Sequence, residues 1–113
     1  MKNKIFISTG GSGGHVLPAI TIYDHLKSNY EILISTDLRG LQYIDKENYK
    51  PITINTPKLN NLFLLPFALS KVLFLTLKCL ILLKKEKISI LVSTGGYMSL
   101  PLCLAAKVLR IKI

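Results

Sequence analysis

The chain has 113 residues, of which half are hydrophobic, and it carries 15 lysines and arginines against 6 acidic residues. This length predicts a single domain, and the hydrophobic content excludes an intrinsically disordered chain. The two cysteines, Cys79 and Cys103, lie in apolar stretches without CxxC spacing. A disulfide scaffold is therefore excluded, and both thiols are expected in a core or an interface in a reducing cytoplasm.

The net charge of +9 is distributed unevenly along the chain. Residues 1–47 hold five basic and five acidic side chains, whereas residues 48–113 hold ten basic side chains and one acidic. The basic half is expected to face an anionic partner, such as a phosphate-bearing substrate, a membrane surface or a nucleic acid. Nucleic acid fits least, because interleaved aromatic residues are lacking and Arg39 and Arg110 are the only arginines. A general bias towards lysine would explain the excess without a partner.

Strands and helices are predicted to alternate along the first half of the chain. Residues 5–8 form a short apolar run that ends in a glycine-rich turn, which is typical of a buried strand. A helical pattern follows to about Lys27, with Pro18 in the first turn. The remaining elements of this half are a strand over 31–35, a short helix over 41–47 and a strand over 51–55.

The second half is predicted to continue this alternation. A long helix is expected to begin near Pro66 and to end at about Lys85, and residues 88–92 form a fully apolar fourth strand. A second glycine-rich loop follows, and Ser99 is expected to cap a last helix. That helix would have Pro101 in its first turn and Ala105, Val108 and Leu109 buried, and residues 111–113 would open a fifth strand.

This order of elements indicates an α/β fold built on a Rossmann-like, doubly wound parallel sheet. In such a sheet the first and fourth strands are neighbours at the topological switch point, and ligands bind outside their carboxyl ends. The two glycine-rich loops, at 9–14 and around 95–96, directly follow these two strands. We therefore expect the loops to lie on either side of one crevice.

The first loop has the composition of a phosphate-binding turn. Four glycines in five residues allow close backbone approach, and the following helix adds its positive end, which suits a phosphate or a sugar diphosphate. A tight strand-to-helix turn without a ligand is the alternative. The loop is not a P-loop, and a dinucleotide fingerprint would need glycine where Val16 stands. Asp37 ends the second strand, where it could bind a ribose or pair with Arg39.

His15 stands at the start of the first predicted helix, facing the mouth of the crevice. The positive end of a helix favours a neutral imidazole, which is the form that a general base needs. The alternative is a histidine that only caps the helix or holds the loop. His25 falls on the polar side of the same helix and is expected to be solvated.

The apolar segment over 59–83 is predicted to lie at a membrane surface and not to cross the bilayer. Its longest uncharged run is too short for a span, and Lys71 and Lys78 interrupt it. Lysines at a spacing of seven form one stripe on a helix with a wide apolar face, which is typical of an interfacial helix. A crossover helix with a solvated lysine stripe is the alternative. The expected membrane contacts are Phe63, Leu64, Phe67, Lys71, Phe74, Lys78, Lys84 and Lys85.

Two motifs resemble those of MurG-like glycosyltransferases of family 28. Residues 9–19, TGGSGGHVLPA, resemble the family's opening GGTGGH motif, and residues 94–101, TGGYMSLP, resemble its GGYVSGP loop. The resemblance covers essentially the whole chain but only the first part of the family's proteins. It implies the N-terminal, acceptor-binding half of an inverting, metal-independent GT-B enzyme without a cofactor. Such enzymes move N-acetylglucosamine from UDP-GlcNAc to undecaprenyl-diphospho-N-acetylmuramoyl-pentapeptide (lipid I), which gives lipid II in peptidoglycan synthesis.

The resemblance also implies roles for particular residues and a location. His15 matches the family's active-site histidine, with a duty as base or as orienting group left open. The domain would lie on anionic lipids at the cytoplasmic face of the bacterial inner membrane, as a peripheral protein. The implied substrate-binding residues are Gly11, Ser12, Gly13, Gly14, Gly95, Gly96, Tyr97 and Ser99.

The sequence departs from the family pattern in several places. Ser12 stands where threonine is usual, Leu100 replaces a glycine, and residues 58–61 replace a stretch that contains glycine and arginine. The chain also ends before the family's HEQN motif, so the donor-binding C-terminal domain is expected to be absent and residues 1–113 alone to be inactive. The alternative function is that of a membrane-anchoring subunit of a split GlcNAc transferase, which recruits a separate donor-binding subunit.

Overall fold

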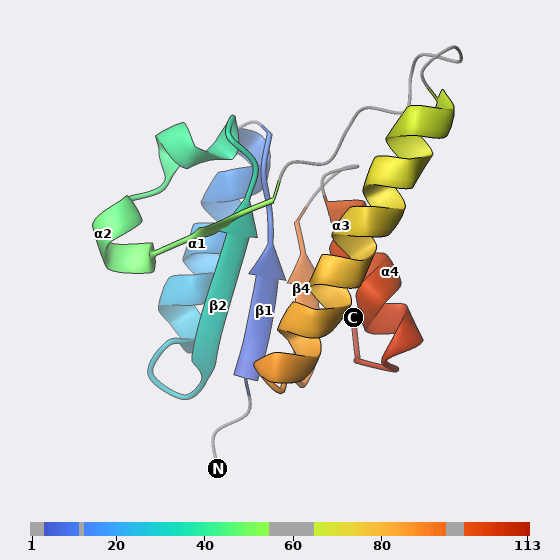
Figure 1. The fold of residues 1–113 in the computed structure, drawn as a ribbon. Coiled ribbons are helices and arrows are strands. Elements are labelled where there is room, and N and C mark those ends of the chain that lie inside the picture. Colours follow the sequence, from blue (N-terminus) through green and yellow to red (C-terminus); the bar gives the residue numbers. More distant parts are fainter. Residues whose placement is uncertain (1–3, 12, 55–64, 95–98) are drawn as a thin grey trace.

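A parallel four-stranded sheet with helices on both faces forms the centre of the molecule (Figure 1). The computed structural model describes residues 4–11, 13–54, 65–94 and 99–113. The α/β class and the alternation predicted from the sequence are confirmed. In chain order the elements are β1 (Lys4–Ser8), α1 (Gly13–Leu26), β2 (Glu31–Thr36), the 3-10 helix η1 (Gly40–Tyr43), α2 (Lys46–Tyr49), β3 (Ile52–Thr53), α3 (Leu65–Lys85), β4 (Ile90–Ser93) and α4 (Leu100–Val108).

The strand order β3-β2-β1-β4 places the first and fourth strands side by side, as predicted. In register, Ser8 at the end of β1 faces Ser35 of β2 and Ser93 of β4. The carboxyl ends of three strands therefore lie level with one another, and the chain segments that follow them share one edge of the sheet. Beyond β4, the Leu91 N–H donates to the Lys112 carbonyl oxygen at 2.7 Å, so the expected fifth strand opens as a single parallel bridge.

Alternating side chains of β1 build a separate core on each face of the sheet. Phe6 is fully buried against α3 and α4, whereas Ile5 and Ile7 point to the other face and pack with α1. Both faces of β1 are apolar because helices cover both, as is usual for the strands of a parallel sheet. The two cores meet only through this sheet, so β1 is the element that fixes the position of α1 relative to α3.

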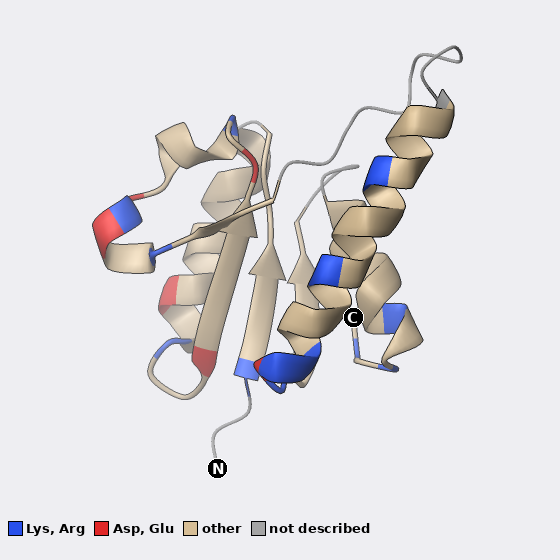
Figure 2. Cartoon of the chain, in the orientation of Figure 1, with Lys and Arg blue, Asp and Glu red and all other residues tan. Residues whose placement is uncertain are grey.

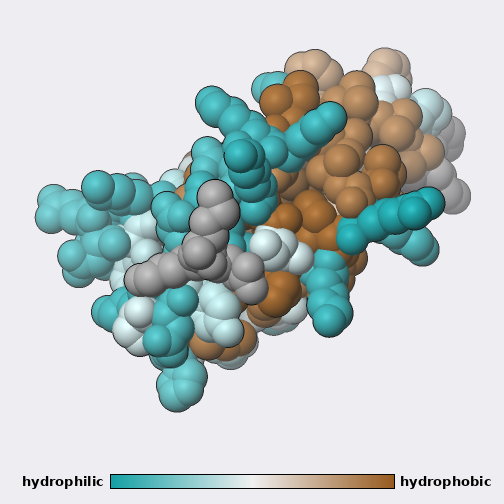
Figure 3. Space-filling view, turned by 90° about the horizontal axis from the view of Figure 1, so that it is seen from below, coloured by the Kyte–Doolittle hydropathy of each residue, from teal (hydrophilic) through white to brown (hydrophobic). Residues whose placement is uncertain are grey.

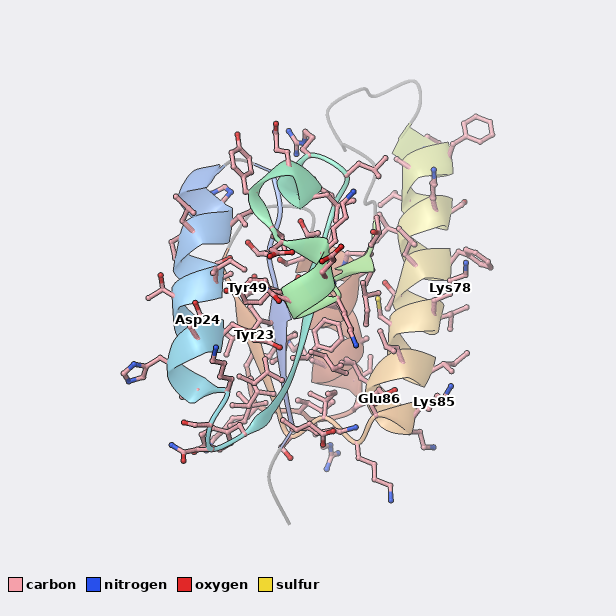
Figure 4. The ribbon with its side chains drawn as sticks, turned by 90° about the vertical axis from the view of Figure 1, so that its left-hand side faces the viewer. Tyr23, Asp24, Tyr49, Lys78, Lys85 and Glu86 are labelled. Atoms are coloured by element: carbon pink, nitrogen blue, oxygen red, sulfur yellow. The ribbon has the colours of Figure 1, made fainter. Side chains whose placement is uncertain are left out.

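The connection between β2 and β3 is fastened to α1 by an aromatic and acidic cluster. The Tyr49 hydroxyl donates to Asp24 Oδ1 at 2.9 Å, and the rings of Tyr23 and Tyr49 meet edge to face (Figure 4). Asp45 caps α2 by accepting from the Glu47 N–H at 3.1 Å, which is why the single short helix predicted over 41–47 is instead split into η1 and α2.

Two local predictions are wrong, and the strand predicted over 51–55 is confirmed but shorter. Helix α1 begins at Gly13, so Pro18 lies inside the helix and not in its first turn, and the Gly14 carbonyl loses its usual donor four residues on. Val108 is 68% exposed because it falls on the outer side of the last turn of α4. Strand β3 has only two residues, since pairing with β2 ends at Thr53.

Candidate functional site

Two hydroxyl bridges join the chain segments that leave β1 and β4. The Thr94 hydroxyl donates to the Thr9 hydroxyl at 2.7 Å, and the Thr9 hydroxyl in turn donates to the His15 carbonyl oxygen at 3.0 Å. The Thr94 N–H also donates to the Ser8 carbonyl oxygen at 3.0 Å. The start of the first glycine-rich loop, the first turn of α1 and the start of the second loop are thus held together, as the sheet order predicts.

Ser99 forms the second bridge, from the far end of the second loop. Its hydroxyl lies 2.9 Å from that of Ser8, and both side chains are buried. The prediction that Ser99 caps α4 is wrong, since its side chain makes no capping hydrogen bond and its hydroxyl is used inside the domain. Residues 95–98 lie outside the described residues, but their two flanks, Thr94 and Ser99, are both attached to the end of β1.

Asp37 shapes the first glycine turn. One carboxylate oxygen, Oδ1, accepts from the Gly11 and Gly40 N–H groups, each at 2.9 Å, and Oδ2 faces the Arg39 guanidinium at 3.3 Å. Gly11 has a φ of 81°, a conformation that other residues adopt only at a cost. The pairing with Arg39 that the sequence left open is confirmed, but the attachment of Asp37 to two backbone turns was missed.

The environment of Asp37 favours its ionised form. Burial alone would raise the pKa of this carboxyl, but the hydrogen bonds from Gly11 and Gly40 and the charge of Arg39 outweigh burial. The pKa is therefore lowered from its ordinary value. A carboxylate that holds two backbone N–H groups is a structural part of the turn, and the Gly11 N–H is already occupied by it.

Tyr43 lies against the first turn of α1 and was not singled out from the sequence. A Cβ placed on Gly13 would be only 3.3 Å from the Tyr43 ring, so glycine at this position lets the ring approach the helix closely. The ring is 44% exposed, which leaves an aromatic surface beside the loop. No pattern in the sequence marked Tyr43, because its position depends on how η1 folds back on α1.

His15 lies in the first turn of α1, as predicted. Its Nδ1 atom is buried and has no hydrogen-bond partner within the described part of the chain, although the ring as a whole is partly exposed. His25, at the other end of the helix, is exposed, as expected. The first backbone N–H groups of α1, from Gly13 onward, have no partner inside the helix and form a cluster of donors at its positive end.

Five of the predicted site residues lie near one another at the carboxyl end of β1, and their roles stay predictions. Gly11, Gly13, Gly14 and His15 lie along the turn into α1, and Ser99 lies beneath it. Among the described residues there is no group of three histidine, cysteine or acidic side chains that could hold a metal ion. The residues Ser12, Gly95, Gly96 and Tyr97 fall outside the described residues.

Helix α3 packs on one side only. Its buried face contains Val72, Cys79 and Leu83, and burial raises the pKa of the Cys79 thiol to about 11, which makes it an unreactive core thiol. By length and hydropathy, residues 66–85 would also pass as a membrane span, but this buried face belongs to the core of the domain. The outer face exposes six large apolar side chains, Phe67, Leu69, Leu73, Phe74, Leu77 and Ile81.

The lysines of α3 emerge among these apolar side chains. Lys71, Lys78, Lys84 and Lys85 are all exposed, and the Lys78 ammonium lies 4.7 Å from the centre of the Phe74 ring. Basic residues follow the helix and gather at its carboxyl end (Figure 2), and Lys78 and Lys85 point away from the sheet (Figure 4). The molecule thus has an apolar surface bordered by hydrophilic side chains (Figure 3). Phe63 and Leu64 lie outside the described residues.

A parallel sheet with a glycine turn and a helix N-terminus at the carboxyl end of its central strand β1 defines a Rossmann-like α/β domain. Residues 5–113 match the glycosyltransferase family 28 N-terminal domain, and the chain belongs to this family. The resemblance read from the two motifs is confirmed. The crystal structure of Acinetobacter baumannii MurG has the same fold, with a TM-score of 0.77 and 23% identity over 96% of this chain and 33% of that one.

The chain is also similar in sequence to longer bacterial proteins. The chain is 46% identical, over its whole length, to the UDP-N-acetylglucosamine--N-acetylmuramyl-(pentapeptide) pyrophosphoryl-undecaprenol N-acetylglucosamine transferase of Pelagibacter ubique, and covers 32% of that protein. It is 32% identical to the protein of the same name from Prochlorococcus marinus strain AS9601, over 99% of the chain and 31% of that protein. The chain spans about a third of the length of these relatives.

Proposed function

We propose that the chain is the acceptor-binding part of a transferase that moves N-acetylglucosamine from UDP-GlcNAc to undecaprenyl-linked N-acetylmuramoyl-pentapeptide. The observation that carries the proposal is the 46% identity to the Pelagibacter ubique transferase over the full length of this chain. The donor site would then belong to a C-terminal domain that corresponds to the rest of the relatives. Acting with that domain, residues 1–113 would bind the lipid-linked acceptor and contribute the loops that face it.

The turn into α1 supports a diphosphate as the ligand of this part. The N–H groups of Gly13 and Gly14, which have no partner within α1, and the positive end of this helix suit an anionic group. The Gly11 N–H is held by Asp37 at 2.9 Å, so Gly11 would contribute its backbone conformation and not this donor. Gly95, Gly96 and Tyr97 are the further proposed acceptor contacts, and the residues on either side of residues 95–98, Thr94 and Ser99, are both hydrogen-bonded at the end of β1.

A chimera tests this function directly. We expect a fusion of residues 1–113 to the remaining two thirds of the Pelagibacter ubique relative to transfer GlcNAc from UDP-GlcNAc to a lipid I analogue, because the chain is 46% identical to the part of the relative that it would replace. The assay is the formation of a lipid II analogue measured with radiolabelled donor. A folded fusion that binds UDP-GlcNAc but transfers no sugar would contradict the proposal.

Residues 1–113 alone serve as the matched control. We expect them to show no transfer, because the relatives are three times longer and the uridine-binding half of the proposed enzyme is not included. Supplying the remainder of the relative as a separate polypeptide extends the comparison to a two-subunit arrangement. Transfer by the isolated chain would refute the assignment of the donor site to a separate C-terminal domain.

We further propose that the outer face of α3 rests on the cytoplasmic leaflet of the inner membrane. Six exposed apolar side chains on one helix form a patch that needs either a partner or a lipid surface, and the interleaved lysines favour an anionic one. A lysine near an anionic leaflet contributes about 1 kcal/mol to binding. Such a location would bring the lipid-linked acceptor within reach of the loops.

Vesicle binding provides the test of this surface. We expect the chain to bind vesicles of phosphatidylglycerol and phosphatidylcholine, and Lys71→Glu with Lys78→Glu to weaken this binding at least about tenfold. Binding should also decrease as salt rises, because the Debye length falls from about 30 Å at 0.01 M to about 3 Å at 1 M. Cosedimentation measures both effects. The matched control makes the same change at Lys27, which follows α1, and at Lys46 in α2. If this control loses as much vesicle binding as the α3 variant, the assignment of the membrane contact to α3 is refuted.

A further inference from the structure

The two ring nitrogens of His15 lie in different surroundings. Nδ1 is buried and makes no hydrogen bond within the described part of the chain. Nε2 is not buried in this way, and the ring is partly exposed. One nitrogen therefore faces the interior without a partner, and the other is the one that a ligand at the turn into α1 can reach.

This asymmetry bears on where the neutral ring carries its proton. If Nδ1 carried it, an N–H would be buried without an acceptor among the described residues, which is rarer in folded proteins than a buried acceptor without a donor. If Nε2 carries it, the N–H points to the accessible side, where water or a ligand can accept. The surroundings therefore favour the tautomer with the proton on Nε2.

The same surroundings disfavour His15 as a general base. A histidine that takes up a proton on Nε2 usually has an acceptor on Nδ1, such as the carboxylate in a serine protease triad, which orients the ring and stabilises its charged form. Asp37, the acidic residue of this turn, is already engaged by Gly11, Gly40 and Arg39. No described residue plays the orienting part for His15.

We propose that neutral His15 carries its proton on Nε2 and donates it, as a hydrogen bond, to an oxygen of the acceptor substrate. This role rests on the proposed function and replaces the open choice between a base and an orienting group. The N–H groups of Gly13 and Gly14 point out of the same helix end, so His15 adds a side-chain donor to a set of backbone donors. The Thr9 hydroxyl, which donates to the His15 carbonyl oxygen at 3.0 Å, holds the backbone of this residue in place.

The tautomer is measured on the 113-residue chain itself. In a long-range proton–nitrogen NMR spectrum of the neutral form, we expect His15 to show Nε2 in the protonated range and Nδ1 in the unprotonated range. His25 is exposed in the same helix and serves as the internal control, with shifts averaged between the two tautomers. Protonation of Nδ1 in His15, or averaging like that of His25, would overturn the proposal.

Substitutions in the chimera test the function of the donor. Glutamine places an amide N–H near the position of Nε2, whereas asparagine reaches only to that of Nδ1. We expect His15→Gln to keep kcat within about tenfold, and both His15→Asn and His15→Ala to lose about 10²–10³-fold, as is usual when one well-placed donor is removed. Equal losses in all three variants would instead identify His15 as the base. His25→Gln is the control that should leave kcat unchanged.

The two experiments keep the two proposals apart. The NMR spectrum decides the tautomer without any transfer reaction, so it can refute the role of His15 even if the chimera is fully active. A chimera that binds UDP-GlcNAc but transfers no sugar counts against the proposed function, whatever the tautomer of His15.

Discussion

Replacement of Asp37 by alanine is expected to lower the free energy of unfolding by about 2–4 kcal/mol. The substitution leaves the Gly11 and Gly40 N–H groups without their acceptor in a buried place, and each such group costs about 1–3 kcal/mol. A loss of this size is a large part of the stability of a single domain. Urea unfolding followed by circular dichroism measures it.

Asp37→Asn is the matched control, because its amide oxygen can still accept from the two N–H groups while the charge is lost. We expect it to destabilise the chain by less than Asp37→Ala. The free energy of unfolding of Asp37→Asn should also fall less than that of the wild type as the pH is lowered. The pKa of Asp37 is lowered in the folded chain, so its contribution is complete above the unfolded pKa of about 4 and is lost as pH falls through the lower folded value. Equal stability of the wild type and both variants at neutral pH would show that Asp37 does not hold the turn.

The second large effect is expected at Gly40, where alanine should destabilise the chain by about 1–3 kcal/mol. A Cβ at this position would collide with the Thr36 hydroxyl oxygen and would lie 3.1 Å from the Gly10 Cα and 3.2 Å from Val16 Cγ2. Thr36 is buried, so its side chain has little room to move. A displacement of the backbone at Gly40 would also displace the glycine turn, because Gly10 belongs to that turn. Thermal unfolding of the variant measures the loss.

A double variant separates the two causes of this strain. Thr36→Ala removes the hydroxyl that the new Cβ meets, so Gly40→Ala should cost less in the Thr36→Ala background than in the wild type. The remaining cost would come from the contacts with the Gly10 backbone and Val16 Cγ2. If the two substitutions are simply additive, the collision with Thr36 is not the source of the effect.

Most of the fold could be predicted because helices and strands have different hydrophobic periods. The predicted start of the long helix lies within a residue of the observed start, since Pro66 suits a first turn and apolar residues recur on every turn after it. The neighbouring positions of β1 and β4 followed from the usual order of a doubly wound sheet. Most errors concern the ends of elements, as at Pro18 and Val108, where a single turn of helix decides whether a side chain is covered. The helix predicted over 41–47 is instead divided into η1 and α2.

The candidate site was predictable only where its residues follow one another in the chain. The glycine turn and His15 were found because a strand, a glycine cluster and a helix stand in sequence. The contribution of Asp37 was missed because it depends on a hydrogen bond to a residue 26 positions away, and that of Tyr43 because it depends on the path of η1. Neither leaves a local pattern, since both arise from tertiary packing.

Because β1 lies between β2 and β4, the sheet cannot be completed until both of these strands have been synthesised. Its partner on one side, β2, is synthesised soon after it, but its partner on the other side, β4, begins only at residue 90. While the ribosome makes the intervening residues, one edge of β1 carries unpaired backbone groups, and Phe6 lacks the helices that cover it. The nascent chain is therefore most vulnerable to aggregation and proteolysis during the synthesis of α3, and the segments that follow β1 and β4 meet only when β4 has left the exit tunnel.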